Sequence, residues 1–285
     1  MKNLIWQAET VEMKSLSNLF ITMTSKSCNN HCKHCYIDFP MYKRGEDFIK
    51  TEIIQKAIED TKQEPVQCIY LTGAEPMTHP DFNAILRLCL KRCNVCICTN
   101  GSLINEKKAR FFKKVSEETS NEIIFKISID HYDEMKNDSI RYRGAFRQAW
   151  FAIKALQKYN FSPIIAVTNY YNEPKEDIYN GFKELFNNLN YDLDSNHIII
   201  SPWHDKNKTS ETPAEYRDQK LDCKNSRVLS DKGIYSCPFL SNDYRGRCGN
   251  DFNDYMKKTT LETDFCQTCL KSKDPIFSID FSKFE

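Results

Sequence analysis

Long apolar runs are missing from this chain of 285 residues. No run approaches the ~20 residues that a membrane-spanning helix needs. The start of the chain, residues 1–15, also lacks the continuous apolar core of a secretory signal. We therefore expect a cytoplasmic protein without a membrane partner.

An excess of either charge is missing as well, since 40 Lys and Arg residues face 39 Asp and Glu residues. A dedicated nucleic-acid binder usually carries a strong basic excess, so the charge balance disfavours a nucleic-acid partner. Glycine and proline are scarce, with 8 and 10 residues, which excludes collagen-like and low-complexity chains. The length suits one large domain, or a larger domain with a small companion.

Cysteine, by contrast, is abundant. In a reducing compartment, thiols are more often metal ligands, catalytic groups or buried apolar residues than disulfide partners. Of the 13 cysteines, none lies between Cys98 and Cys223. One group near each end of the chain predicts two metal sites on two structural units.

Short β-rich runs alternate with longer amphipathic runs over most of the chain. The runs that read as strands are 19–24, 67–72, 95–99, 123–129, 163–168 and 197–201, and those that read as helices are 52–62, 80–93, 105–119, 144–159 and 174–188. Repeated βα units build a parallel sheet with right-handed crossovers and external helices. We therefore predict an α/β fold, a partial (β/α)6 TIM-like barrel, with ligands at the carboxyl ends of its strands.

The character of the sequence changes after the last expected strand. Residues 203–220 are polar, and the remainder has five cysteines and few apolar residues, as in small units held together by metal. We therefore divide the chain into an N-terminal flank (1–17), the barrel core (18–205), a linker (206–220) and a small C-terminal domain (221–285).

The first cysteine group, Cys28, Cys32 and Cys35, has CxxxCxxC spacing directly after the first expected strand. Three thiolates on one loop can hold three irons of a 4Fe-4S cluster and leave the fourth iron open for a cofactor. Zinc is the alternative, with His31 or His34 as a fourth ligand.

This array, with Tyr36 directly after the third cysteine, resembles the signature of the radical S-adenosylmethionine (SAM) superfamily. The resemblance covers about residues 18–201. It implies that S-adenosylmethionine binds the open iron and that its reductive cleavage yields a 5′-deoxyadenosyl radical, which abstracts a substrate hydrogen.

Further segments at the ends of expected strands resemble the cofactor-binding segments of that family. Gly73, Ala74 and Glu75 resemble its GGEP turn, with Ala74 in place of the second glycine, and this implies contact with the cofactor's ammonium group. The other implied cofactor-binding residues are Asn100, Ser128 and Asp130 for the ribose and the methionyl carboxylate, Arg143 in preference to Arg141 for that carboxylate, and Asn169 for the ribose or adenine.

The second cysteine group resembles the short auxiliary-cluster extension called twitch, a truncated SPASM domain. The resemblance implies that Cys223, Cys237, Cys266 and Cys269 hold an auxiliary 4Fe-4S cluster. Cys248 is then surplus, and we consider it as an alternative ligand, a catalytic thiol or a spare residue. A zinc ribbon is the alternative for this group.

Several other residues have less specific patterns. Cys96 and Cys98 fall on one face of an expected strand, so we expect buried thiols, with Cys98 near the mouth of the barrel. Residues 131–133 and 203–205 follow expected strands and are candidates for substrate contact.

The resemblance implies an oxidoreductase-type radical SAM enzyme. We expect it to oxidise a small metabolite or peptide by dehydrogenation or cross-linking, or to epimerise it, with a donor such as flavodoxin or ferredoxin supplying electrons. The alternative from another class is a non-catalytic zinc or iron-sulfur protein that senses redox state.

Overall fold

The computed structural model describes residues 9–37, 47–187, 197–205, 220–241, 243–272, 275–279 and 281. The strands are β1 (Thr10–Glu12), β2 (Asn18–Thr22), β3 (Cys68–Thr72), β4 (Asn94–Thr99), β5 (Ile123–Ser128), β6 (Ile164–Asn169), β7 (Ile198–Pro202), β8 (Ser226–Ser230), β9 (Gly233–Tyr235), β10 (Arg247–Asp251), β11 (Asp254–Tyr255) and β12 (Lys258–Thr260). The helices are α1 (Thr51–Asp60), α2 (Phe82–Leu90), α3 (Glu106–Ser116), α4 (Glu134–Ile140), α5 (Ala145–Gln157), α6 (Lys175–Asn187) and α7 (Asp264–Lys271).

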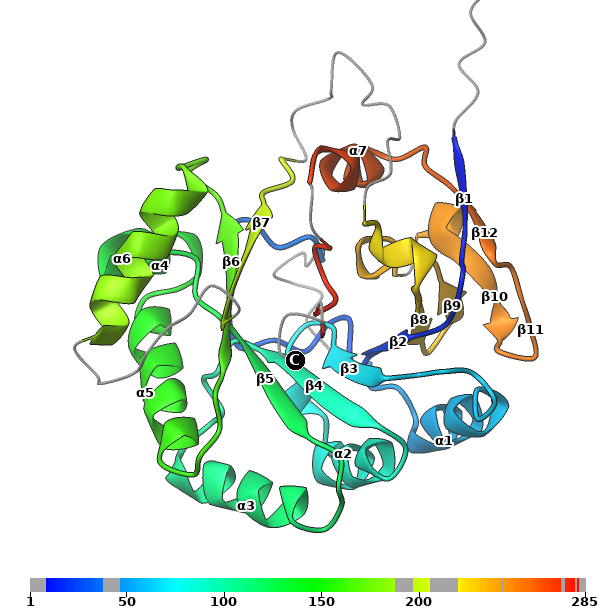
Figure 1. The fold of residues 1–285 in the computed structure, drawn as a ribbon, viewed down its shortest axis with the longest axis horizontal. Helices are drawn as coiled ribbons and strands as arrows, with labels where there is room; N and C mark the ends of the chain where they lie inside the picture. The colour runs from blue at the N-terminus through cyan, green and yellow to red at the C-terminus, as the bar shows by residue number, and fades with distance from the viewer. Residues whose placement is uncertain are drawn as a thin grey trace, which may run out of the picture.

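Strands β2 to β7 form a parallel sheet in chain order, and the helices between them lie outside its curve (Figure 1). The predicted partial (β/α)6 barrel is confirmed. All six strands and five helices lie near their expected positions. The short helix α4 was not expected, because its seven residues are too few to show a clear helical period.

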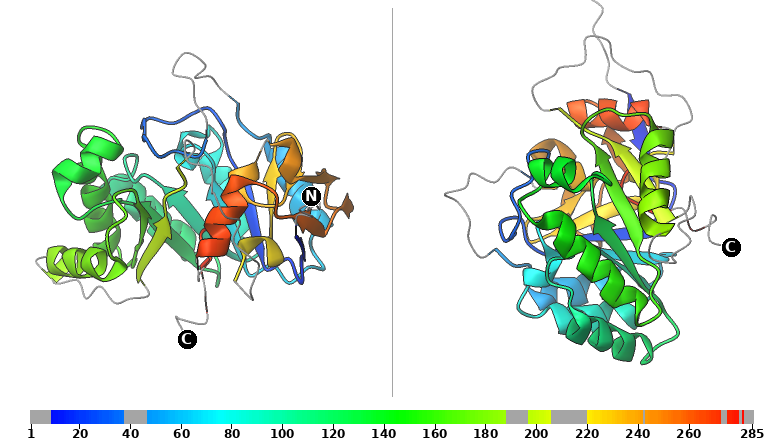
Figure 2. Two further views of the ribbon diagram at one scale, coloured as in Figure 1. Left: turned by 90° about the horizontal axis from the view of Figure 1, so that it is seen from above. Right: turned by 90° about the vertical axis from the view of Figure 1, so that its left-hand side faces the viewer.

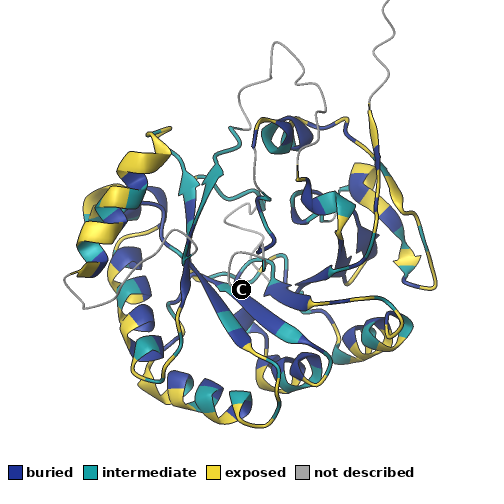
Figure 3. Cartoon of the chain, viewed as in Figure 1, coloured by how far each residue is buried: buried dark blue, intermediate teal, exposed yellow. Residues whose placement is uncertain are grey.

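The two faces of each strand pack into different layers, as the period of two requires. On β3, Ile69 and Leu71 pack under the helices, while Cys68 and Tyr70 point into the barrel. Strands β2 to β5 are accordingly buried along most of their length, and the exposed residues of the barrel gather on the outer helix faces (Figure 3). No helix in the described part of the chain is long and apolar enough to cross a membrane.

The C-terminal region continues the barrel sheet. Strand β8 pairs in parallel with β2, and β9, β10 and β11 extend the same sheet with antiparallel pairing. Near the other end of the chain, β1 pairs with β12, so the N-terminal flank contributes a strand to this region. The C-terminal elements lie at the end of the molecule opposite α4 to α6 (Figure 2). The expected linker, apart from residue 220, lies outside the described residues.

The segment 275–279 enters the barrel and is fixed from three sides. The buried Asp222 carboxylate, in the short 3-10 helix η4 (Asp222–Lys224), accepts hydrogen bonds from the backbone N–H groups of residues 276, 277 and 278 at 2.8–3.0 Å. Lys126 Nζ on β5 donates to the carbonyl of Phe277 at 2.9 Å, and Tyr70 Oη accepts from the N–H of Ile279 at 2.9 Å. The barrel interior is therefore partly filled by the end of the chain.

Candidate active site

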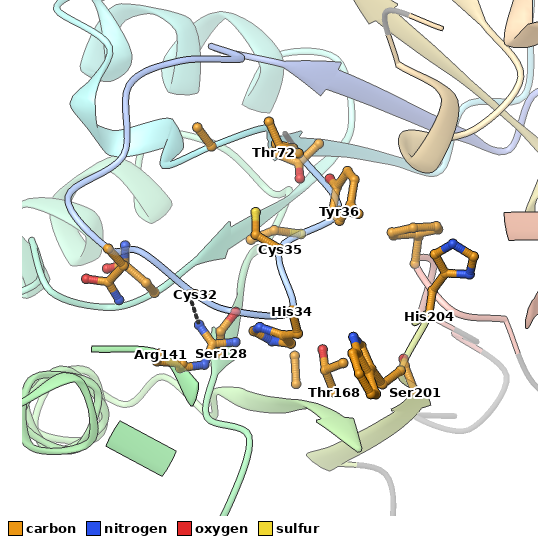
Figure 4. Close-up of a pocket in the computed structure, with 18 of the residues that line it drawn as sticks. Cys32, His34, Cys35, Tyr36, Thr72, Ser128, Arg141, Thr168, Ser201 and His204 are labelled. Atoms are coloured by element: carbon orange, nitrogen blue, oxygen red, sulfur yellow. Dashed lines mark hydrogen bonds between the residues drawn. The ribbon is translucent and has the colours of Figure 1, made fainter. Parts of the chain in front are cut away.

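A cavity of about 590 Å³ opens at the carboxyl ends of the barrel strands (Figure 4). Its lining comes from the loop after β2, from the ends of β3 to β7 and from the C-terminal region. The residues include Cys28, Cys32, Cys35, Tyr36, Thr72, Gly73, Ala74, Cys98, Asn100, Lys126, Ser128, Arg141, Thr168, Ser201, Trp203, His204, Asp205, Phe239, Ile276 and Phe277. Parallel strands bring these segments together although they are far apart in the chain.

The three cysteines of the first group line this cavity from one loop. The loop is fixed to the barrel because Asn100 Nδ2 on the next segment donates to Asn29 Oδ1 at 2.9 Å. Burial raises the pKa of the Cys32 thiol, and the nearby Arg141 guanidinium opposes this rise. Arg141 Nη1 lies 3.9 Å from Cys32 Sγ, as the dashed line in Figure 4 marks.

The thiols of this loop suit an iron-sulfur cluster by their chemistry, because such clusters are held by cysteine thiolates. Among the described residues, no group of three or more His, Cys, Asp or Glu side chains is arranged to hold a single metal ion. A four-iron cluster is larger than one ion and spreads its cysteine ligands further apart.

The turn after β3 depends on glycine at one position. Gly73 has a φ of +111°, and a Cβ there would lie 2.4 Å from the carbonyl oxygen of Thr24. Ala74 is not among the described residues with positive φ, so alanine is tolerated in this turn. Both residues line the cavity, as the resemblance implied.

Glu75 lies beneath this turn, away from the cavity. Its side chain is fully buried, and its carboxylate accepts hydrogen bonds from Thr99 Oγ1 at 2.8 Å and from the N–H groups of Asn100 and Met77 at 2.9 and 3.2 Å. In this structure Glu75 fixes the Asn100 segment, and its direct contact with the cofactor stays a prediction. Burial raises the pKa of Glu75 to about 7.

This raised pKa makes stability depend on pH. The folded protein holds a proton on Glu75 that the unfolded chain has lost, so stability should fall as pH rises from about 4.5 to 7 and level off above. The full effect is at most about 3 kcal/mol. We expect Glu75→Gln to remove this part of the slope, measured as the melting temperature from pH 5 to 8. Equal slopes in both proteins would contradict the assignment.

Asp130, Arg141 and His34 form a buried charged cluster at the edge of the cavity. Arg141 Nε lies 2.5 Å from Asp130 Oδ2, and His34 Nε2 lies 2.9 Å from the same oxygen. Burial alone would raise the pKa of the Asp130 carboxyl, but Arg141 and His34 hold it well below its usual range. Asp130 does not line the cavity but holds Arg141 and His34, which do. Its expected contact with the cofactor stays a prediction.

The two arginines of this segment have different positions. Arg141 is buried beside Cys32 and lines the cavity, whereas Arg143 is exposed and does not. The position of Arg141 favours it over Arg143 as the partner of a carboxylate in this cavity, and the expected role of Arg143 stays a prediction. The period of the sequence could not distinguish them, because Arg141 follows the last turn of the unexpected helix α4.

The other residues expected at the site also fall into two groups, those that line the cavity and those that do not. Tyr36, Asn100 and Ser128 line the cavity, as do residues 203–205. Asn169 does not, because its side-chain amide donates to the backbone carbonyl of Glu173 at 2.7 Å and accepts from the N–H of that residue. His131 also lies outside the lining and pairs with the Glu173 carboxylate at 3.2 Å.

The four cysteines of the second group, Cys223, Cys237, Cys266 and Cys269, line a second, small cavity in the C-terminal region. Burial raises the pKa of Cys223 to about 12, and the thiol of Cys266 contributes to the rise. The pKa of Cys269 is raised by burial and by the other three thiols. Four thiols around one cavity form a donor set that suits an iron-sulfur cluster, whereas they are not arranged to hold a single zinc ion.

Cys248 lies elsewhere. It is buried in the main hydrophobic core on β10, lines neither cavity, and its Sγ contacts the carbonyl oxygen of Gly246 at 3.5 Å. Cys248 therefore lies outside the lining of the first cavity, and the role of a catalytic thiol stays a prediction. Cys98 does line that cavity, while Cys96 is fully buried.

A layer of aromatic rings separates the two cavities. Phe239 and Phe277 line both of them, with ring centroids 4.6 Å apart. On one side Tyr36 contacts Phe239 at 5.4 Å, and on the other Phe265 stacks on Phe239 at 4.7 Å. The chain thus places one aromatic layer between its two thiol groups. Neither Phe239 nor the segment 275–279 was singled out in the sequence, because no local pattern marks them.

These features define a class of protein, namely a partial parallel barrel with three cysteine thiols on one loop at the ligand-binding end. A family model described as the Radical SAM superfamily matches residues 22–185. The chain belongs to the radical SAM superfamily. It is therefore a radical SAM enzyme, a class that uses S-adenosylmethionine and a 4Fe-4S cluster.

Known proteins similar to this chain include a cysteine-type anaerobic sulfatase-maturating enzyme of Clostridium novyi (strain NT). It is 30% identical over 175 residues, which are 55% of this chain and 45% of that relative. The chain thus matches less than half of the length of this relative. Similar solved structures include anSMEcpe with bound AdoMet and Kp18Cys peptide, with a TM-score of 0.62, 14% identity, and coverage of 92% of this chain and 91% of that one.

A further similar structure is SuiB of Streptococcus suis bound to S-adenosylmethionine. Its TM-score is 0.61 at 13% identity, and the match covers 80% of this chain and 61% of that one. At such low identity, these structures show a shared fold.

Proposed function

We propose that this enzyme oxidises a peptide substrate, with its first cavity as the reaction site and an auxiliary iron-sulfur cluster as the electron acceptor. The observation that carries the proposal is the position of Cys28, Cys32 and Cys35, which line one cavity together with the ends of β3 to β7. When bound there, a 4Fe-4S cluster and S-adenosylmethionine supply a 5′-deoxyadenosyl radical that abstracts a substrate hydrogen.

The protein's own groups position the reactants. Under this proposal the three thiols hold three irons and leave one iron for the cofactor. Arg141, fixed by Asp130, supplies a buried positive charge beside Cys32, which suits a carboxylate of the cofactor. Asn100 and Ser128 supply hydrogen-bonding groups to the same cavity.

The second group of thiols supports an oxidation. Four cysteines satisfy all four irons of a cluster, so the substrate would not need to bind there. A single aromatic layer, formed by Phe239 and Phe277, separates the two cavities. An electron from the substrate radical would then reach the second site without direct coordination. Under this proposal the core (18–205) carries the reaction site and the C-terminal domain (221–285) carries the auxiliary cluster.

Two comparisons favour a peptide over a small metabolite. The Clostridium novyi relative is named for the maturation of a sulfatase, which is a polypeptide, and anSMEcpe has been solved with bound peptides. Ser201 and Asp205 supply further polar groups to the cavity lining.

The proposal is tested by anaerobic reconstitution and reduction in the presence of S-adenosylmethionine. We expect about eight iron and eight sulfide per chain, and formation of 5′-deoxyadenosine. Cys237→Ser should lower the iron content to about four while the protein still cleaves the cofactor. Unchanged iron content in Cys237→Ser would contradict the auxiliary cluster, and a protein with about four iron at the outset would contradict it as well.

A further inference from the structure

One charged side chain lies inside the barrel. Among the residues of strands β2 to β7, Lys126 in the middle of β5 is the only Asp, Glu, Lys or Arg. Its neighbours Phe125 and Ile127 pack under the helices, so the Lys126 side chain points to the opposite face, into the barrel. A lysine at such a position is unusual, because burying a charge costs free energy unless a partner compensates it.

The ammonium group of Lys126 has neutral partners. The residue is only 7% exposed, and its Nζ donates to the backbone carbonyl oxygens of Phe277 at 2.9 Å and Ile276 at 3.4 Å. In the described part of the chain no carboxylate forms an ion pair with Lys126. An ammonium group has three N–H donors, so these two carbonyls leave one donor for a further acceptor.

The other buried cations of the described residues are Arg141 and Arg227, and both are compensated differently. Arg141 pairs with the Asp130 carboxylate. Arg227 lines neither cavity, and its guanidinium donates to the backbone carbonyls of residues 223, 226, 256 and 257. Lys126 differs from both, because it combines a charge without a carboxylate partner with a place in the lining of the first cavity.

Lys126 lies deep in that cavity. It lines the cavity together with Cys98, its direct neighbour on β4, and with Ser128, two residues further along β5. Two residues of a strand span roughly 7 Å, so Lys126 lies one layer below Ser128 in the barrel. Ser128 is an expected cofactor contact, and the charge of Lys126 is therefore on the inner side of the expected cofactor position.

The charge acts on the cavity lining. The Sγ atoms of Cys96 and Cys98 lie 4.0 Å apart, and this contact lowers the pKa of Cys98; burial opposes the effect, and the charge of Lys126 adds to it. Asp205 is the only carboxylate among the described residues of the lining, and it forms no ion pair with Lys126. The inner part of the cavity thus favours an anionic ligand.

We propose that Lys126 binds a carboxylate group of the substrate inside the first cavity. This inference rests on the proposed function, because it names the chemistry of the peptide that enters the cavity. The carboxylate belongs to an acidic side chain or to the C-terminus of the peptide, and it fills the third donor position of the ammonium. Lys126 then determines specificity, because a buried charged donor discriminates strongly against a neutral group at the same place.

The test uses Cys98 as a reporter of charge in the cavity. Iodoacetate carries a carboxylate, iodoacetamide is its neutral counterpart, and both alkylate thiols. The full chain is reconstituted anaerobically and treated with each reagent, and tandem mass spectrometry gives the rate of labelling at Cys98 itself. The ratio of the two rates is the readout, because a change in the thiolate fraction of Cys98 affects both reagents equally.

We expect Lys126→Met to lower the ratio of iodoacetate to iodoacetamide labelling at least about tenfold at low salt. Lys126→Arg keeps the charge and should keep most of the ratio. Lys107→Met removes an exposed charge of α3 and should leave the ratio unchanged. Lys126→Met should also melt no lower than the wild type, since it removes a buried charge that no carboxylate compensates.

The two sources of the carboxylate are distinguished by protection of Cys98 against iodoacetamide. The probes are N-acetylglutamic acid α-amide, with a side-chain carboxylate, N-acetylglutamine, with an α-carboxylate, and the neutral N-acetylglutamine amide. At least one of the two carboxylates should protect the wild type better than the neutral compound does, and this difference should vanish in Lys126→Met. The better of the two carboxylates identifies the source.

Three outcomes would overturn the role of Lys126: an equal labelling ratio in Lys126→Met and wild type, no labelling of Cys98 by either reagent, or protection that does not depend on the probe's charge. A lower melting temperature of Lys126→Met with an unchanged ratio would assign Lys126 to holding the segment 275–279 alone. The proposed function is judged separately by 5′-deoxyadenosine formation in the wild type. If it forms while the ratio is unchanged, the function stands and the carboxylate site does not.

Discussion

Cys32→Ala is expected to abolish formation of 5′-deoxyadenosine, by at least about a hundredfold, and to lower the iron content from about eight to about four per chain. Two remaining thiols on the loop cannot hold the irons that three held. The auxiliary cysteines lie in a separate cavity and should keep their iron. The measurements are iron and sulfide analysis after anaerobic reconstitution and chromatography of the products after reduction.

A matched control is Cys93→Ala. This cysteine is buried and lines neither cavity. Its replacement should change neither the iron content nor cofactor cleavage. If Cys32→Ala still forms 5′-deoxyadenosine at a rate near that of the wild type, the three-thiol site is not the reaction centre.

Asp130→Asn is expected to destabilise the fold by about 3–5 kcal/mol, because it leaves the buried guanidinium of Arg141 without its carboxylate. Asp130 also accepts the N–H of Thr168 at 2.9 Å, which ties β6 to the loop after β5. For a chain of this size the loss corresponds to a fall in melting temperature of roughly 6–10 °C. Thermal unfolding of the anaerobically purified protein measures it.

The double variant Asp130→Asn with Arg141→Met tests the cause of this loss. Removing both charges leaves no unpaired buried ion, so the double variant should be more stable than Asp130→Asn alone. Since the pKa of Asp130 is held low, its contribution is present at neutral pH and should be lost only as pH falls below about 4. A single variant within about 1 kcal/mol of the wild type would contradict the role of the ion pair.

The sequence was informative wherever a short pattern carries the physics. CxxxCxxC spacing is local, so the position of Cys28, Cys32 and Cys35 on one loop follows from the chain itself. The alternation of β-rich and amphipathic runs is likewise local, and it predicted the six strands of the barrel and their order. Gly73, Asn100 and Ser128 lie at the carboxyl ends of three parallel strands. They line one cavity because the carboxyl ends of parallel strands meet at the same edge of the sheet.

The sequence could not distinguish residues of the same type that differ only in burial. Arg141 and Arg143 are two positions apart, yet one packs beside Cys32 and the other faces solvent. Glu75 and Asp130 carry carboxylates, a group that often binds ligands. In the structure these carboxylates accept hydrogen bonds from N–H groups or pair with charged side chains below the cavity surface. Such differences depend on which neighbours fold against each side chain.

The sequence by itself determined the cysteine loop, the order of the barrel strands and the existence of two thiol groups, because each depends on spacing along the chain. The tertiary structure alone decided that the segment 275–279 enters the barrel, that Phe239 and Phe277 separate the two cavities, and that Cys248 is buried in the core. These features join residues far apart in sequence, so they depend on sheet register and side-chain packing, which local patterns do not specify.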